Sequence, residues 1–151
     1  MKNRHVRLCT SVMVAMTALA ALTLSACHHA PDEVQVREAI ESGARAAEDG
    51  NAAGVVASLS DDFDGNAGAL DRRALRATVS VFKLRGEQVK ANVGPISIER
   101  RGQRLVATFA LTLRAGGRLL PEHMGVYQVE SAWRKDDSHW RCYSATWKQA
   151  F

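Results

Sequence analysis

The sequence lacks the short motifs that identify the commonest catalytic and cofactor sites. It has no Gly-rich phosphate loop, no serine-nucleophile motif and no Cys-x-x-Cys pair. Its three cysteines are too few for a disulfide scaffold. It also has no internal repeat, low-complexity stretch or long linker. What remains is a globular chain of 151 residues, the length of one domain. We expect no cofactor and no metal ion.

A strong charge of one sign is also missing once the N-terminus is set aside. The formal net charge is +4, but the only charged residues in 1–26 are Lys2, Arg4 and Arg7. The rest of the chain has 17 basic and 16 acidic residues. This near balance removes the argument for nucleic-acid binding that a basic chain would otherwise raise.

The N-terminus has the order of an export signal. The three basic residues are followed by an uncharged run from Leu8 to Leu24. This run has the length of a signal h-region and is slightly short for a membrane-spanning helix. It ends in Leu24-Ser25-Ala26-Cys27, which resembles the bacterial lipobox. The resemblance implies cleavage of the signal peptide 1–26 and attachment of lipid, including an acyl chain such as palmitate, to Cys27.

The same resemblance predicts a place in the cell. Asp directly after the lipidated Cys tends to retain such lipoproteins in the inner membrane, and here that position is His28. We therefore expect an outer-membrane anchor with the domain facing the periplasm, joined by a short tether at 27–32. A plain secretory peptide with an incidental Cys, or an uncleaved membrane anchor, remains the alternative.

Hydrophobic spacing predicts helices in the first half of the mature chain. Helical periodicity covers 33–49 and a shorter segment at 52–59. A third helix is expected over 72–84, with Asp71 as N-cap and Leu75, Val79 and Phe82 on one face.

The second half changes to an alternating pattern typical of strands. One strand region is expected at 88–93 and 96–99, interrupted at Gly94-Pro95, followed by strands over 105–114, 124–134 and 140–148. Helices followed by hairpin-linked strands predict an α+β fold in which the N-terminal helices pack against a curved antiparallel sheet.

The order of these segments resembles the nuclear transport factor 2-like or SnoaL-like domains. The resemblance rests on Leu59-Ser60-Asp61-Asp62-Phe63 after the second helix and on the closing Trp140-Arg141 and Tyr143-Ser144-Ala145-Thr146-Trp147. It spans about Glu33 to Trp147 and implies a single cone-shaped, cystatin-like domain at 33–151 with an open pocket. The family contains isomerases, dehydratases and cyclases as well as binding and assembly modules, so fold does not settle function.

Several polar residues are candidates for chemistry in such a pocket. These are Asp61, Asp62, Asp64, Glu122, His123, Glu130, Tyr127 and Tyr143. An apolar pocket can turn a carboxylate into a general base, and His123 has a suitable pKa. The Asp cluster lacks the Gly and distal Glu of a calcium loop, and Asp residues just after a helix are also typical of a solvated turn. A His at the entry of a strand and near a Pro is, however, more often a rim or loop residue.

The aromatic residues suggest binding more than catalysis. Tyr127, Trp133, Tyr143 and Trp147 are candidates, with His123, for a ligand-binding or interface surface, although aromatic residues also fill cores. Strand alternation predicts that Trp140 and Cys142 face opposite to Tyr143 and Trp147. Cys142 is expected to be a buried small hydrophobe rather than a reactive thiol.

Charge within the mature chain is divided. Residues 27–70 have nine acidic and two basic groups, whereas 71–151 have 15 basic and seven acidic groups. The basic groups could attract anionic lipid or an acidic partner, or could complement the acidic first helix.

These observations favour an anchored lipoprotein whose domain binds a small apolar ligand or a protein partner, including a second copy through the sheet, without catalysis. A pocket enzyme of isomerase, dehydratase or hydrolase type that uses a carboxylate or His123 is one alternative. A structural subunit of an envelope complex is the other.

Overall fold

The computed structural model describes residues 30–117 and 120–150, with the backbone alone for 117 and 120–123. Residues Pro31–Phe151 form one compact unit. The expected signal peptide 1–26, Cys27 and the start of the tether lie outside the described residues. Among the helices that are described, none is long and apolar enough to cross a membrane.

In the described part of the chain, three helices precede or interrupt the sheet: α2 (Asp32–Glu48), α3 (Ala52–Val55) and α4 (Arg72–Leu84). Helix α4 has the predicted bounds, and Asp71 caps it by accepting a hydrogen bond from the Ala74 N–H at 2.6 Å. Helix α3 is shorter than the predicted 52–59. Asn51 caps it by accepting from the Gly54 N–H.

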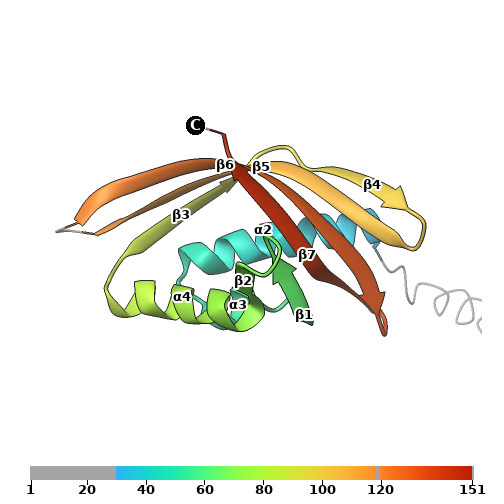
Figure 1. Ribbon diagram of the computed structural model, residues 1–151, viewed down its shortest axis with the longest axis horizontal. Coiled ribbons are helices and arrows are strands. Elements are labelled where there is room, and N and C mark those ends of the chain that lie inside the picture. Colours follow the sequence, from blue (N-terminus) through green and yellow to red (C-terminus); the bar gives the residue numbers. More distant parts are fainter. Residues whose placement is uncertain (1–29, 118–119, 151) are drawn as a thin grey trace, which may run out of the picture. The chain divides into compact units, whose positions relative to one another are not determined.

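Seven strands within residues 30–117 and 120–150 form one sheet. They are β1 (Leu59–Gly65), β2 (Leu70–Asp71), β3 (Gln88–Val93), β4 (Ser97–Arg101), β5 (Arg104–Gly117), β6 (Leu120–Asp136) and β7 (His139–Gln149). The order along the sheet is β2-β1-β7-β6-β5-β3, and β4 also pairs with β5. The sheet curves over α2 and α4, as Figure 1 shows, so the predicted α+β architecture is confirmed.

The expectation of a purely antiparallel sheet needs one correction. Among the described pairs, β1 runs parallel to β7, with Leu59 opposite Cys142 and Gly65 opposite Ala145, whereas the other pairs are antiparallel. The segment 59–65 was expected as the end of a helix and a turn. It forms a strand because it pairs with β2 and β7, and Ser60, Phe63 and Gly65 are buried. The burial does not alternate strictly, since two exposed residues, Asp61 and Asp62, lie between Ser60 and Phe63.

The break predicted at Gly94-Pro95 divides two strands that share a partner. Strand β3 pairs with residues 111–116 of β5, and β4 pairs with residues 104–108. The Gly94 N–H donates to the Ala110 carbonyl at 2.8 Å between them. The long strand β5 is thereby covered at both ends along one edge, which lets the sheet bend around the helices.

The core lies between α2 and the inner face of the sheet. Val36 of α2 and Leu105 of β5 are fully buried, and Trp133, Trp140 and Cys142 of the last two strands are nearly so. Toward α4 the filling is incomplete, because no residue of α4 is buried. The space left there is the candidate site.

Candidate functional site

An apolar cavity of about 630 Å³ lies between α2, α4 and the inner face of the sheet. This volume is within the range of small-molecule sites. Its walls are mostly aliphatic and aromatic; the sheet contributes Val89, Ala91, Val93, Phe109, Leu111, Leu113, Val129 and Trp133. The described structure therefore contains the pocket that the sequence resemblance implied.

The two helices leave this space open for opposite reasons. Helix α2 presents mainly small residues to it, Ala39, Gly43, Ala44 and Ala47, together with Ile40, and these small side chains do not fill the gap. Helix α4 presents Leu75, Val79 and Phe82, the face predicted from their spacing. Helix α4 therefore forms a hydrophobic wall of the cavity rather than part of a closed core.

The polar side chains that the inner face of the sheet contributes to the cavity, Ser131, Trp133 and Cys142, form the deep end of the lining and are hydrogen-bonded within the protein. Ser131 accepts a hydrogen bond from Trp133 Nε1 at 2.9 Å and donates to the Ala107 carbonyl at 3.3 Å. Cys142 donates from Sγ to the Ser144 carbonyl, and burial raises the pKa of its thiol to about 12. Cys142 is buried, as expected. In the described lining, the deep end offers no group suited to proton transfer at neutral pH.

Two helix ends contribute exposed residues to the lining, among them Glu48, Asp49, Lys83 and Gly86, and we call this part of the cavity its mouth. At the end of α2, the Gly50 N–H donates to the Ala47 carbonyl and the Asn51 N–H to the Ala46 carbonyl. At the end of α4, the Gly86 and Glu87 N–H groups donate to the carbonyls of Lys83 and Phe82. Both are Schellman motifs with a glycine at positive φ, which only glycine adopts readily.

These motifs place charged residues at the mouth. Glu48, Asp49 and Glu87, which we call the mouth carboxylates, line the cavity together with Lys83. Glu48 accepts a hydrogen bond from the Ala91 N–H at 3.1 Å. The sequence-based predictions do not include these residues. The sequence feature that could have indicated them is the pair of helix stops, Asp49-Gly50 and Gly86-Glu87, each with a carboxylate beside the glycine.

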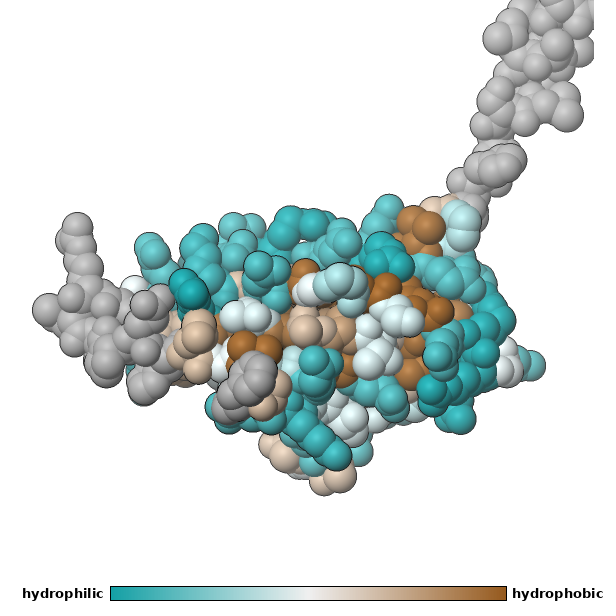
Figure 2. All heavy atoms as spheres, turned by 90° about the horizontal axis from the view of Figure 1, so that it is seen from above, coloured by the Kyte–Doolittle hydropathy of each residue, from teal (hydrophilic) through white to brown (hydrophobic). Residues whose placement is uncertain are grey.

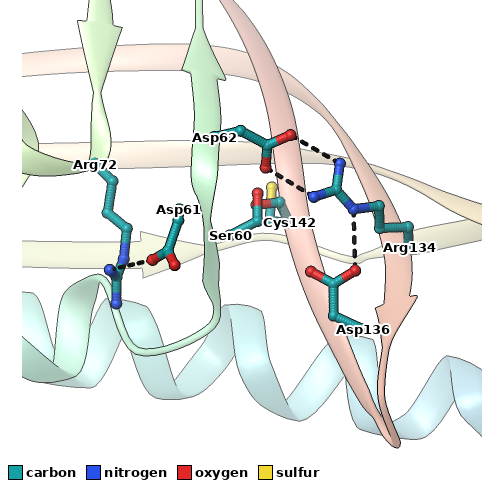
Figure 3. Close-up of polar contacts among 7 residues, drawn as sticks. All are labelled: Ser60, Asp61, Asp62, Arg72, Arg134, Asp136 and Cys142. Atoms are coloured by element: carbon teal, nitrogen blue, oxygen red, sulfur yellow. Dashed lines mark hydrogen bonds and ion pairs between the residues drawn. The ribbon is translucent and has the colours of Figure 1, made fainter.

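The predicted Asp cluster lies elsewhere (Figure 3). Asp61 contacts Arg72 at 2.8 Å, and Asp62 accepts two hydrogen bonds from Arg134, at 2.8 and 3.0 Å. The Arg134 guanidinium holds the pKa of Asp62 down at about 2, with Ser60 contributing. None of these carboxylates lines the cavity. They are structural ion pairs on β1, so the hypothesis that they act as a pocket base is not supported.

The candidate aromatic residues divide among three places. Trp133 lines the cavity, whereas Tyr127 and Trp147 pack against the core. Tyr143 lies on the outer face under Arg134, whose guanidinium carbon is 5.4 Å from the ring centroid. Figure 2 looks onto this outer face, where paler and hydrophobic side chains along the middle are surrounded by hydrophilic ones.

One part of the face prediction was wrong. A bulge between Ala132 and Trp133 of β6 leaves Tyr143 as an extra residue on β7, because Trp133 is opposite Cys142 and Ala132 is opposite Ser144. Trp147 is therefore on the inner side, opposite Val129, and not with Tyr143.

His123 is placed only in part. Its backbone lies on β6 opposite Ala115 of β5. Its side chain and that of Glu122 lie outside the described residues. In the described part of the chain, no group of three or more His, Cys, Asp or Glu side chains gathers in a way that could hold a metal ion.

The acidic first helix and the basic second half meet at the start of α2. Asp32 accepts hydrogen bonds from Trp140 Nε1, Lys135 and Arg100, at 2.9, 2.9 and 3.0 Å. These donors hold the pKa of Asp32 far below its usual value. The basic groups of this region therefore complement α2, which was one of the two roles proposed for them.

Comparison with known proteins gives the fold. The sequence matches no family model and no curated protein. Its structure resembles a protein from Novosphingobium aromaticivorans provisionally named a scytalone dehydratase (TM-score 0.70, 11% identity, 79% of this chain and 84% of that one). It also resembles a provisionally named calcium/calmodulin-dependent kinase II association domain from Exiguobacterium sibiricum (0.67, 12%, 83% and 98%).

A further likeness is to an NTF2-like protein with a cystatin-like fold from Novosphingobium aromaticivorans (TM-score 0.64, 14% identity, 93% of this chain and 89% of that one). At these identities a likeness shows architecture and not activity. The chain has the NTF2-like, cystatin-like α+β fold.

Proposed function

We propose that this protein binds a small apolar ligand in the cavity between α2, α4 and the sheet, without catalysis. We also propose that it does so as a lipoprotein anchored through Cys27 and facing the periplasm. The observation that carries the binding proposal is the cavity itself, about 630 Å³ of mostly apolar lining. Water in such a space finds few hydrogen-bond partners, so an apolar ligand that displaces it gains the hydrophobic free energy.

The non-catalytic part rests on the chemistry of the lining. Ser131, Trp133 and Cys142 are engaged with protein partners, and the titratable carboxylates are at the mouth rather than at the deep end. A pocket enzyme would need an acid or base near the bound ligand's reacting atoms. His123 and Glu122 remain candidates for that alternative, and loss of turnover in a folded His123→Ala or Glu122→Ala variant would support it.

Two valines on one helix give a matched test of binding. Val79 of α4 lines the cavity, whereas Val81 is exposed two residues away and does not. Val79→Trp should fill the space and weaken binding of the uncharged fluorescent probe N-phenyl-1-naphthylamine by about tenfold or more. Val81→Trp should leave binding unchanged. The measurement is probe fluorescence with the full chain in lipid nanodiscs, after subtraction of empty nanodiscs.

The outcome that contradicts the proposal is equally definite. Equal probe affinity in wild type, Val79→Trp and Val81→Trp would mean that the probe does not enter this cavity. Circular dichroism of the three proteins establishes that each is folded.

A further inference from the structure

We propose that the cavity ligand is an amphiphile with an apolar body and a cationic amino head, and that Glu87 recognises this head. The inference rests on the proposed function, because it assigns a chemical class to the ligand of the same cavity. It is carried by two features of the mouth: the surroundings of the Glu87 carboxylate and the convergence of two helix C-termini.

Glu87 is fixed in position by its own backbone. Its N–H closes the Schellman motif of α4 on the Phe82 carbonyl at 3.0 Å, and strand β3 begins at the next residue. Phe82 and Glu87 both line the cavity. The side chain therefore starts from a rigid junction between the helical wall and the sheet wall, which is the arrangement required of a specificity residue.

The Glu87 carboxylate is sheltered but poorly partnered. Only 12% of its side chain is exposed, and in the described structure its one ionic contact is with Arg85 at 3.9 Å, beyond hydrogen-bond distance. Because no buried side-chain oxygen of the described chain lacks a hydrogen-bond partner, the unbonded Glu87 oxygens are still reached by water, which the head group of a ligand can replace. An ammonium group supplies three N–H donors and a positive charge, so it fits this acceptor better than a hydroxyl or a carboxylate.

The helix ends add to the same preference. Helices α2 and α4 have 17 and 13 residues, and both direct their C-termini to the mouth. Each C-terminus has a partial negative charge equivalent to about half an elementary charge. Glu48 and Asp49 at the end of α2 increase it.

Two cationic side chains reduce the negative electrostatic potential at the mouth without cancelling it. Lys83 lines the mouth, with its stem close to Gly50, and the Arg85 side chain is 65% exposed. Against Lys83, the lining has the three mouth carboxylates. A ligand with a carboxylate head would meet three like charges and two helix C-termini, so we expect it to be rejected.

The test compares three probes with one alkyl chain and different heads. Dodecylamine, dodecanol and dodecanoate, each below its micelle concentration at pH 7, compete with N-phenyl-1-naphthylamine on the full chain in nanodiscs. We expect dodecylamine to displace the dye at about tenfold lower concentration than dodecanoate, with dodecanol between them. Empty nanodiscs correct for partition into lipid.

The variant Glu87→Gln keeps the shape of the side chain and removes its charge. It should reduce the amine preference at least about threefold while leaving displacement by dodecanol unchanged. Glu130→Gln is the matched control, because Glu130 is exposed on β6 beside the inward-facing Val129 and does not line the cavity. It should retain the full preference.

Two results would overturn the assignment while leaving ligand binding intact. One is a preference for dodecanoate, which would make Lys83 the head-group residue. The other is an amine preference that persists unchanged in Glu87→Gln. Failure of all three probes to displace the dye, with no effect of Val79→Trp, would instead contradict the proposed function.

Discussion

Cys142 lies on β7 at the cavity floor, and its chemistry is set by its surroundings. The thiolate, not the thiol, is the nucleophile, and the burial of this side chain raises its pKa to about 12. At pH 8 about one molecule in ten thousand would have the thiolate. The residue therefore behaves as a small hydrophobe, as expected from its place among Trp140, Arg141 and Tyr143.

This predicts slow alkylation despite the neighbouring cavity. Iodoacetamide at pH 8 should modify Cys142 of the native protein at least about a hundredfold more slowly than in urea, where the thiol recovers its ordinary pKa. Mass spectrometry of the Cys142 peptide gives the rate without interference from other cysteines. Comparable rates in both conditions would show that the thiol is accessible through the cavity.

The alternation of residues along β7 predicted the direction of some side chains and not of others. Alternation along β7 placed Trp140, Cys142 and Tyr143 correctly, because a strand side chain switches face at each step. It failed for Trp147, since the bulge at Tyr143 shifts the alternation by one residue. A bulge depends on how β6 and β7 pair, which no local pattern encodes.

At the scale of elements, α4 could be predicted to the residue and β1 could not be predicted at all. Helix α4 has local signals at both ends, the Asp71 cap and Gly86. Strand β1 has Asp at three of its seven positions, a composition typical of a turn. Its strand conformation comes from tertiary pairing with β7, and ion pairs balance the charges of Asp61 and Asp62 while Asp64 accepts a hydrogen bond from the Gly68 N–H. The same holds for the surroundings of Glu87. The sequence predicts where α2 and α4 end, but it does not predict that the two ends lie close together in space.

The Asp62–Arg134 pair links β1 to β6 across β7, so it should influence stability in acid. The pKa of Asp62 is about 2 in the folded protein, against 3.8 as the ordinary value. A depressed pKa contributes stability above the unfolded value, and this contribution is lost as pH falls from about 4 to 2. Asp62→Asn should lower the urea midpoint at pH 7 slightly and flatten its decline between pH 4 and 3.

The neighbouring Asp61→Asn is the control for that experiment. Its carboxylate is 98% exposed and makes a single contact, with Arg72. Surface pairs of this kind contribute little, and less in high salt. If Asp61→Asn and Asp62→Asn change the decline of the urea midpoint between pH 4 and 3 equally, the two hydrogen bonds from Arg134 to Asp62 have no special role in stability.

At the scale of the whole molecule, the chain from residue 27 onward has nearly equal numbers of acidic and basic residues, but the two kinds are unevenly distributed along it. The acidic start of the domain and its basic second half meet at Asp32, where Trp140, Lys135 and Arg100 converge. Cys27, the proposed lipid site, is only five residues before Asp32, which allows a reach of about 17 Å when extended. The three hydrogen bonds to Asp32 thus hold the first turn of α2 against the sheet, directly after the tether in the sequence.

Anchoring is a property of the whole chain, and one substitution tests it. Two or more acyl chains hold a protein stably at a membrane, whereas a cleaved, unlipidated chain has no such hold. Cys27→Ser should therefore remove labelled palmitate from the protein and prevent its stable recovery in the outer-membrane fraction. Cys9→Ser, the same substitution within the uncharged run, should leave both properties unchanged. A Cys27→Ser protein that still sediments with membranes as wild type does would refute lipid anchoring.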